Sequence, residues 1–166
     1  MVLPPCQKFS LASKLRANWK DGRPISEDAR AAIRLVEHGL WLIRELRPRD
    51  FFMENPVGMM RTLAQLRDIP RHTVTYCQYG ERYQKPTDIW THSAISFKRR
   101  CTAGAPCHER APRGSKAGIQ GMANAFERGK LPDALCAHVA RWCAGVHAGV
   151  EQRRLVSAQD EEEIRF

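Results

Sequence analysis

Two side chains in this sequence have the types and surroundings needed to attack an electron-poor ring. Cys6 follows two prolines, which fix φ and remove backbone donors, and this predicts a rigid loop that presents the thiol. Glu54 follows the apolar run 51–53 and precedes Asn-Pro, which predicts a buried strand with the carboxylate at its carboxyl end. A thiolate is a soft nucleophile and a carboxyl group can donate a proton. The pair could therefore add to carbon 6 of a cytosine ring and protonate its ring nitrogen.

The elements expected around these groups alternate between helices and strands. Ser26 is expected to cap a helix that runs to about Leu46, with Trp41 in the core. Strands are expected around Phe51 and at residues 73–77 and 88–91, and a last helix at about 131–142. This order predicts an α/β fold, the second half of a doubly wound Rossmann-like sheet with helices on both faces. In such a sheet, ligands bind at the carboxyl ends of the strands.

Both candidate groups lie in segments that resemble a known family. The stretch Pro-Pro-Cys-Gln-Lys-Phe-Ser at residues 4–10 resembles the catalytic loop of DNA cytosine-5 methyltransferases. Glu-Asn-Pro at residues 54–56 resembles the second signature of that family, which is usually Glu-Asn-Val. Segments 76–80, 85–90, 107–115 and 131–136 are similar to a bacteriophage-encoded branch. The resemblance runs from the first residues to about Arg141.

The resemblance implies a reaction and a set of site residues. The reaction is methyl transfer from S-adenosylmethionine to carbon 5 of cytosine in double-stranded DNA, through a covalent adduct with Cys6. Glu54 would hold the ring nitrogen and the exocyclic amine. Where the family has Gln-x-Arg-x-Arg, this chain has Gln-Lys-Pro, so Lys85, or with less support Arg82, would serve instead. The remaining expected site residues are Pro4, Pro5 and Asn55 at the cofactor, and Gln7, Ser10, Arg82, Arg110, Arg113 and Lys116 at the DNA.

The glycine turn that holds S-adenosylmethionine in this family is missing from the sequence. The family carries Phe-x-Gly-x-Gly near its amino end, and no Gly-x-Gly occurs in these 166 residues. We therefore expect a fragment of a longer enzyme, a decayed reading frame, or one part of a split enzyme whose second polypeptide supplies the cofactor-binding half. The alternative is a non-catalytic DNA-binding remnant or regulatory subunit.

Charge and composition agree with a nucleic-acid partner. The chain has 27 Lys and Arg against 18 Asp and Glu, a formal net charge of +9, and 43% hydrophobic residues. Residues 1–150 are expected to form a partial catalytic domain. Within it, residues 98–125, rich in Gly, Pro and Arg, are the candidate DNA-recognition loop. Residues 151–166 form a charged tail.

The six cysteines are expected to be free thiols. The sequence shows neither a secretory signal nor a membrane span, which predicts the reducing cytoplasm of a bacterial or phage-infected cell. Cys101, Cys107 and His108, with Cys77 or His92 as a fourth ligand, have the right types for zinc. The five-residue gap and the adjacent Cys-His pair do not match the usual spacing, so no metal is expected.

Overall fold

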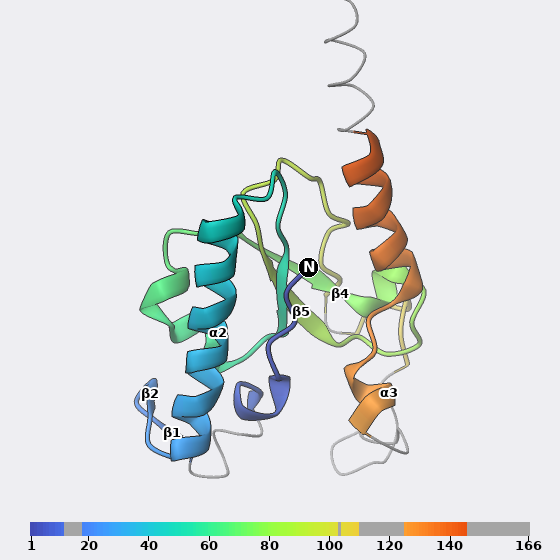
Figure 1. Ribbon diagram of the computed structural model, residues 1–166. Coiled ribbons are helices and arrows are strands. Elements are labelled where there is room, and N and C mark those ends of the chain that lie inside the picture. Colours follow the sequence, from blue (N-terminus) through green and yellow to red (C-terminus); the bar gives the residue numbers. More distant parts are fainter. Residues whose placement is uncertain (12–17, 103, 110–124, 146–166) are drawn as a thin grey trace, which may run out of the picture. The chain divides into compact units, whose positions relative to one another are not determined.

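The computed structural model describes residues 1–11, 18–102, 104–109 and 125–145 (Figure 1). The chain divides into two compact units, Met1–Pro132 and Asp133–Phe166. The described part of the second unit is a helix over residues 133–145. The first unit contains, in chain order, η1 (Cys6–Lys8), β1 (Trp19–Lys20), β2 (Arg23–Pro24), α2 (Glu27–Leu46), β3 (Met53–Pro56), η2 (Met59–Thr62), η3 (Ala64–Leu66), β4 (Arg71–Thr75), η4 (Tyr76–Tyr79), β5 (Pro86–Trp90) and α3 (Ala125–Gly129), where η denotes a 3-10 helix.

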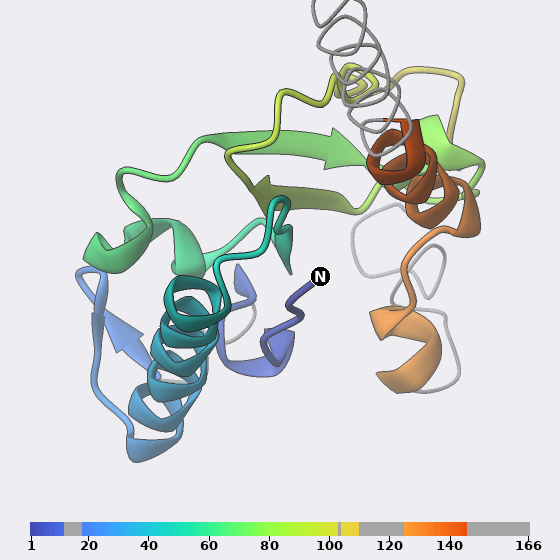
Figure 2. The same ribbon diagram turned by 45° about the horizontal axis from the view of Figure 1, so that its top comes forward.

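A three-stranded sheet forms the centre of the first unit. Strand β5 lies between β3 and β4 and is antiparallel to both, so β3 and β4 run in the same direction. Figure 2 shows β4 and β5 side by side. On the other side of β3, Val2 forms a parallel bridge with Met53. Two hydrogen bonds hold this bridge, from Val2 N to the Phe52 carbonyl (2.7 Å) and from Glu54 N to the Val2 carbonyl (3.1 Å).

The mixed α/β class predicted from the sequence is confirmed. The expected strands are present, with boundaries that differ by about two residues; β4, for example, ends at Thr75 because residues 76–79 turn into η4. The expectation that the strand ends at Glu54 is wrong, because β3 continues through Asn55 and Pro56, which pair with Asp88 and Thr87. The doubly wound arrangement with helices on both faces stays a prediction. None of the helices in the described part of the chain has the length and apolar character needed to cross a bilayer.

Helix α2 begins and ends where its local sequence predicts. The Ser26 hydroxyl accepts a hydrogen bond from Ala29 N (3.1 Å), and Glu27 and Asp28 place negative charge in the first turn. Arg47 ends the helix in a left-handed conformation with φ of 43°. The predicted helix is therefore confirmed.

The face that α2 buries consists of small residues. They are Ala29, Ala32, Val36 and Gly39. A Cβ atom on Gly39 would lie 3.0 Å from Val2 Cγ1 and 3.4 Å from Met53 Cε, so the helix approaches the first residues and β3 closely. Trp41 was expected in the core, and this is wrong because it lies about 140° around the helix from Val36. Its side chain is 46% exposed and stacks on His38.

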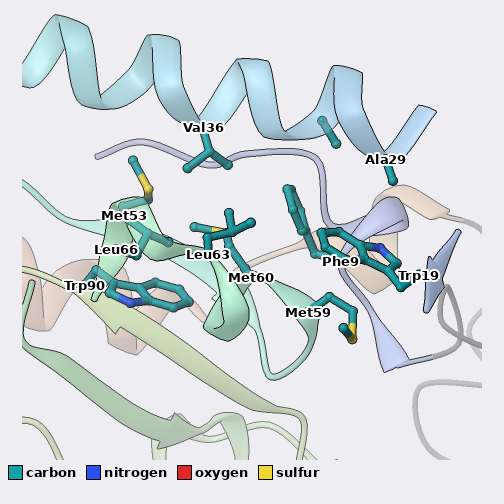
Figure 3. Packing of buried hydrophobic residues seen from close by; sticks show 11 residues of the cluster. Phe9, Trp19, Ala29, Val36, Met53, Met59, Met60, Leu63, Leu66 and Trp90 are labelled. Atoms are coloured by element: carbon teal, nitrogen blue, oxygen red, sulfur yellow. The ribbon is translucent and has the colours of Figure 1, made fainter. Parts of the chain in front are cut away.

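The hydrophobic core lies between α2, the amino-terminal segment and the sheet. Figure 3 shows Val36 pointing from α2 towards Met53 and Met60, and Phe9 beside Trp19. The cluster consists of Phe9, Trp19, Ala29, Ala32, Val36, Met53, Met59, Met60, Leu63, Leu66 and Trp90. Since Phe9 belongs to the loop that carries Cys6, core packing fixes the position of that loop.

Candidate catalytic site

The loop that carries Cys6 is a single tight turn. Cys6 opens η1, and its carbonyl accepts hydrogen bonds from Phe9 N (3.1 Å) and Ser10 N (3.0 Å). Pro4 is buried, and Pro5, which is exposed, has the φ of −55° that its ring imposes. The Cys6 side chain is half-buried. The two prolines are followed by a short 3-10 turn that carries the thiol, and the rigidity of this segment stays a prediction.

Three contacts join this loop to the end of β3. Asn55 Nδ2 donates to the Pro4 carbonyl (2.8 Å) and Met59 N donates to the Phe9 carbonyl (2.6 Å). Ser10 forms an antiparallel bridge with Gly58. A Cβ atom on Gly58 would lie 2.1 Å from the Phe9 carbonyl oxygen, so only glycine allows the two segments to approach this closely.

Glu54 is a buried carboxyl group with two hydroxyl donors. It is 7% exposed, and its Oε1 accepts hydrogen bonds from Thr87 Oγ1 and from the Tyr76 hydroxyl (3.3 Å). Burial raises the pKa of Glu54, and this effect exceeds the opposing effects of Thr87, Lys85 and Tyr76. The neutral acid is therefore favoured at higher pH than for an exposed glutamate, and in that form Glu54 can donate a proton.

Lys85 connects the two candidate groups electrostatically. It is 8% exposed, and its Nζ lies 4.5 Å from the centroid of the Tyr76 ring. Burial lowers the pKa of Lys85, while the charges of Glu54 and Cys6 act in the opposite direction. The lysine is therefore within electrostatic reach of both the carboxylate and the thiol. The structure brings the three residues expected to be catalytic, Cys6, Glu54 and Lys85, into one region.

A second buried carboxylate on β5, Asp88, is used in an ion pair. Arg61 binds it through two nitrogens, Nε to Oδ2 (2.5 Å) and Nη2 to Oδ1 (2.7 Å), and Thr73 Oγ1 donates to Oδ1 (2.7 Å). Neighbouring residues of a strand point to opposite faces of the sheet. Asp88 and Thr87 are neighbours on β5, so the ion pair between Arg61 and Asp88 lies on one face of the sheet. The contact of Thr87 with Glu54 lies on the other face.

The three residues expected at the cofactor are adjacent to each other. Asn55 is completely buried, and its amide nitrogen donates a hydrogen bond to the Pro4 carbonyl. Asn55 Oδ1 has no partner among the described residues but is also buried, so a cofactor cannot reach it in this conformation. Pro5 is exposed. These residues position the Cys6 loop and do not by themselves form a pocket that fits S-adenosylmethionine.

The residues expected to bind DNA are only partly described. Gln7 is exposed on η1, next to Cys6, and Ser10 is half-buried. Arg82 is exposed and paired with Glu109, to which its Nε donates (2.8 Å). Arg110, Arg113 and Lys116 lie outside the described residues, as does most of the segment 98–125.

Sequence reasoning gave no role to Tyr76, Thr87 or Gly58. Tyr76 and Thr87 lie in the segments 76–80 and 85–90 that resemble the family, but nothing local indicates that both would point at Glu54. Their contacts depend on the pairing of β5 with β3, in which Glu54 is opposite Ile89 and Pro56 is opposite Thr87. A glycine shortly after a strand end was the only signal for Gly58.

Comparisons of the chain with protein-family models, with curated proteins and with solved structures give no match.

Proposed function

We propose that this chain is the cytosine-binding half of a DNA cytosine-5 methyltransferase, with Cys6 as nucleophile and Glu54 as acid. The observation that carries this proposal is the parallel pairing of Val2 with Met53. It makes the amino-terminal segment and β3 neighbours that run in the same direction. Glu54 lies within β3, and Asn55 Nδ2 beside it donates to the Pro4 carbonyl (2.8 Å), two residues before Cys6. The pairing therefore brings the segments that carry Cys6 and Glu54 together.

The environment of Glu54 supports its role as acid. Addition of a thiolate to carbon 6 of cytosine moves electron density to the ring nitrogen, which then needs a proton. Burial raises the pKa of Glu54, so a larger fraction of it is neutral and able to give that proton. Thr87 and Tyr76 both bind Oε1, and this fixes the orientation of the carboxyl plane.

The chemical step balances with these two residues and one water. A bond forms between the Cys6 thiolate and carbon 6, and the electron pair of the C5–C6 double bond moves through the ring to the nitrogen, which takes the Glu54 proton. Carbon 5 of the resulting enamine is nucleophilic. It takes a proton from water, and the hydroxide left behind removes the original carbon 5 proton. The Glu54 carboxylate then takes back the proton of the ring nitrogen as Cys6 leaves as a thiolate, which restores cytosine. Carbon 5 hydrogen exchange is therefore a measure of this half-reaction alone.

Double-stranded DNA is the proposed substrate, with the target base flipped out of the helix. The net charge of +9 supports a polyanionic partner. Gln7 is placed next to Cys6 and is exposed, so it is the described residue best placed to contact the strand beside the target base. Arg82 would contact phosphates, and it would have to exchange its Glu109 partner to do so.

S-adenosylmethionine is the methyl donor that this proposal implies. The described residues at Pro4, Pro5 and Asn55 do not fit it on their own, and the sequence contains no Gly-x-Gly. We propose that a second polypeptide supplies that half. No step of the mechanism above passes through the cofactor.

The test is hydrogen exchange at carbon 5 of cytosine. The full chain is incubated in tritium-free water with DNA that carries tritium at carbon 5 of cytosine, and released tritium is counted. We expect release by the unaltered protein, loss of at least about 100-fold in Cys6→Ser and Glu54→Gln, and unchanged release in Cys136→Ser. Cys136 is an exposed thiol on the helix over residues 133–145 and serves as the matched control.

Measuring DNA binding by the same variants distinguishes an active methyltransferase half from a non-catalytic DNA-binding remnant. If Cys6→Ser binds DNA normally and the unaltered protein releases no tritium, the chain is a non-catalytic DNA-binding remnant. A second arm measures transfer of labelled methyl groups from S-adenosylmethionine after addition of a candidate cofactor-binding polypeptide. Transfer that depends on Cys6 would identify that polypeptide as the missing half.

A further inference from the structure

Three thiols and one imidazole that the proposed reaction does not use converge at the end of β4. Cys77 belongs to η4, and Cys101, Cys107 and His108 belong to the segment that follows β5. One ligand atom from each lies within 4.8 Å of every other. The four residues come from three separate stretches of the chain, so folding, and not sequence adjacency, brings them together.

Four of the six separations between the ligand atoms are close to the edges of a tetrahedron around a small cation, and all six are within 4.8 Å. Cys77 Sγ lies 3.2 Å from Cys101 Sγ and 3.7 Å from Cys107 Sγ. His108 Nδ1 lies 3.8 Å from Cys101 Sγ and 3.5 Å from Cys107 Sγ. A zinc ion with bonds of about 2.3 Å to sulfur and 2.0–2.1 Å to nitrogen places its ligands roughly 3.5–3.8 Å apart.

We propose that Cys77, Cys101, Cys107 and His108 bind one Zn²⁺ ion in a closed structural site. Three thiolates and one imidazole are a usual ligand set for structural zinc, and a tetrahedral arrangement of soft ligands selects zinc over calcium or magnesium. The sequence disfavoured this site because Cys107 and His108 are adjacent. In the structure both of these side chains nevertheless reach the same point, since His108 presents Nδ1 and not Nε2.

Two of the three sulfurs in the cluster have neighbours that can stabilise a thiolate. Gln84 Nε2 lies 3.0 Å from Cys101 Sγ and Gln78 Nε2 lies 3.3 Å from Cys107 Sγ, so each of these sulfurs has an amide donor. Donors of this kind orient metal-bound sulfur and stabilise its negative charge. Cys101 is also fixed by its backbone, because its N–H donates to Thr75 Oγ1 (3.0 Å).

The fourth ligand is assigned by position. His92, the other candidate in the sequence, lies edge-on against Phe51 with 5.6 Å between ring centroids, and it is not in the cluster. Cys77 is buried and belongs to the cluster, with two sulfur neighbours.

The site would fasten the segment after β5 to the end of β4. The described residues 101–102 and 104–108 have only turns and bends as secondary structure, so a metal ion is a strong way to order them. Glu109 N donates to the Arg82 carbonyl (2.7 Å), which extends the same attachment by one residue. The zinc proposal does not depend on the proposed reaction at Cys6.

The experiment measures bound metal in the full chain, produced without an affinity tag that binds metals. We expect about one zinc per chain by elemental mass spectrometry. Cys107→Ser and His108→Ala should lose at least nine-tenths of it, and Cys136→Ser should keep it. The first two replace an exposed and a half-buried side chain, so their effect on packing is small.

A second measurement does not depend on variants. Protein stripped with a chelator is titrated with Co²⁺, which should give the intense visible bands and sulfur-to-metal charge transfer of a tetrahedral thiolate site at one equivalent. Zinc should then displace the cobalt.

Three results would overturn the proposal. The first is unaltered protein with less than about a tenth of a zinc per chain and no cobalt bands. The second is full zinc content in Cys107→Ser and His108→Ala. The third is evidence that the sulfurs do not bind zinc. Such evidence would be a disulfide between Cys77 and Cys101 in protein purified from a reducing cytoplasm, or bound iron with acid-labile sulfide.

Discussion

Replacing Gly58 by alanine tests how the Cys6 loop is held. The added Cβ would lie 2.1 Å from the Phe9 carbonyl oxygen and 3.0 Å from its carbonyl carbon, and both are backbone atoms. Separating them to van der Waals contact requires a shift of more than about 1 Å. That shift breaks the hydrogen bond from Met59 N to the Phe9 carbonyl, which is 2.6 Å long.

The expected cost follows from these two effects. Overpacking in a close-packed region costs about 1–3 kcal/mol, and loss of the hydrogen bond adds about 0.5–1.5 kcal/mol. We therefore expect Gly58→Ala to lower the free energy of unfolding by about 2–4 kcal/mol. The perturbed segment carries Cys6, so carbon 5 hydrogen exchange should fall as well.

Two other glycines provide a graded control. A Cβ on Gly39 would meet only side-chain atoms, Val2 Cγ1 at 3.0 Å and Met53 Cε at 3.4 Å, which can move, so we expect Gly39→Ala to cost about 1 kcal/mol or less. A Cβ on Gly129 would meet nothing within 4 Å, so Gly129→Ala should change stability by less than about 0.5 kcal/mol.

The assay is urea denaturation followed by tryptophan fluorescence, because Trp19 and Trp90 are both in the core cluster. We expect Gly58→Ala to be the most destabilised of the three, because at Gly39 a gain in helix propensity of about 0.5–1 kcal/mol offsets the side-chain contacts. Equal stability of Gly58→Ala and Gly129→Ala, within about 0.5 kcal/mol, would refute the argument that the Phe9 carbonyl fixes this position.

Two further predictions concern buried charge. Arg61→Met should lower the free energy of unfolding by about 3–5 kcal/mol, because Asp88 has no exposed surface and loses the arginine that binds it through two nitrogens. The control Arg67→Met replaces an exposed arginine and should cost less than about 0.5 kcal/mol. If urea denaturation gave similar losses for the two variants, the ion pair would not be important for stability. Burial raises the folded-state pKa of Glu54, so the folded state holds this proton more tightly than the unfolded state does. The resulting stability is fully present below the unfolded pKa of about 4.3. It is lost as the pH rises through the folded-state pKa. Glu54→Gln should therefore flatten the fall in stability above pH about 4.3, measured by urea denaturation across pH, and an unchanged pH profile would show that Glu54 is not the group responsible.

Local signals in the sequence were sufficient for the elements. Helix α2 was predicted with its ends because Ser26, the acidic first turn and the apolar period all act within a few residues. The Cys6 turn was predicted because proline fixes φ wherever it stands. The same reasoning failed at Pro56, which pairs with Thr87 as the last residue of β3 and does not end the strand at Glu54. One local signal was missed: Asp21 and Gly22 both have positive φ (47° and 77°) and close the hairpin of β1 and β2.

Interactions between distant segments were decided only by the tertiary structure. The sequence supplied Glu54 and Lys85 but not the hydroxyl groups of Thr87 and Tyr76 on the same carboxyl oxygen, because those contacts depend on strand register. A shift of one residue would turn each side chain to the other face of the sheet.

The cysteine cluster and Trp41 show the same limit. Sequence spacing argued against a metal at Cys107 and His108, yet the return of the chain after β5 places both beside Cys77. Trp41 has a helical spacing that fits a core position, but the surface that α2 actually buries is set by its close approach at Gly39. The sequence by itself determined the local elements and the types of reactive groups. The fold decided which groups meet, because register and packing depend on atoms that are far apart along the chain.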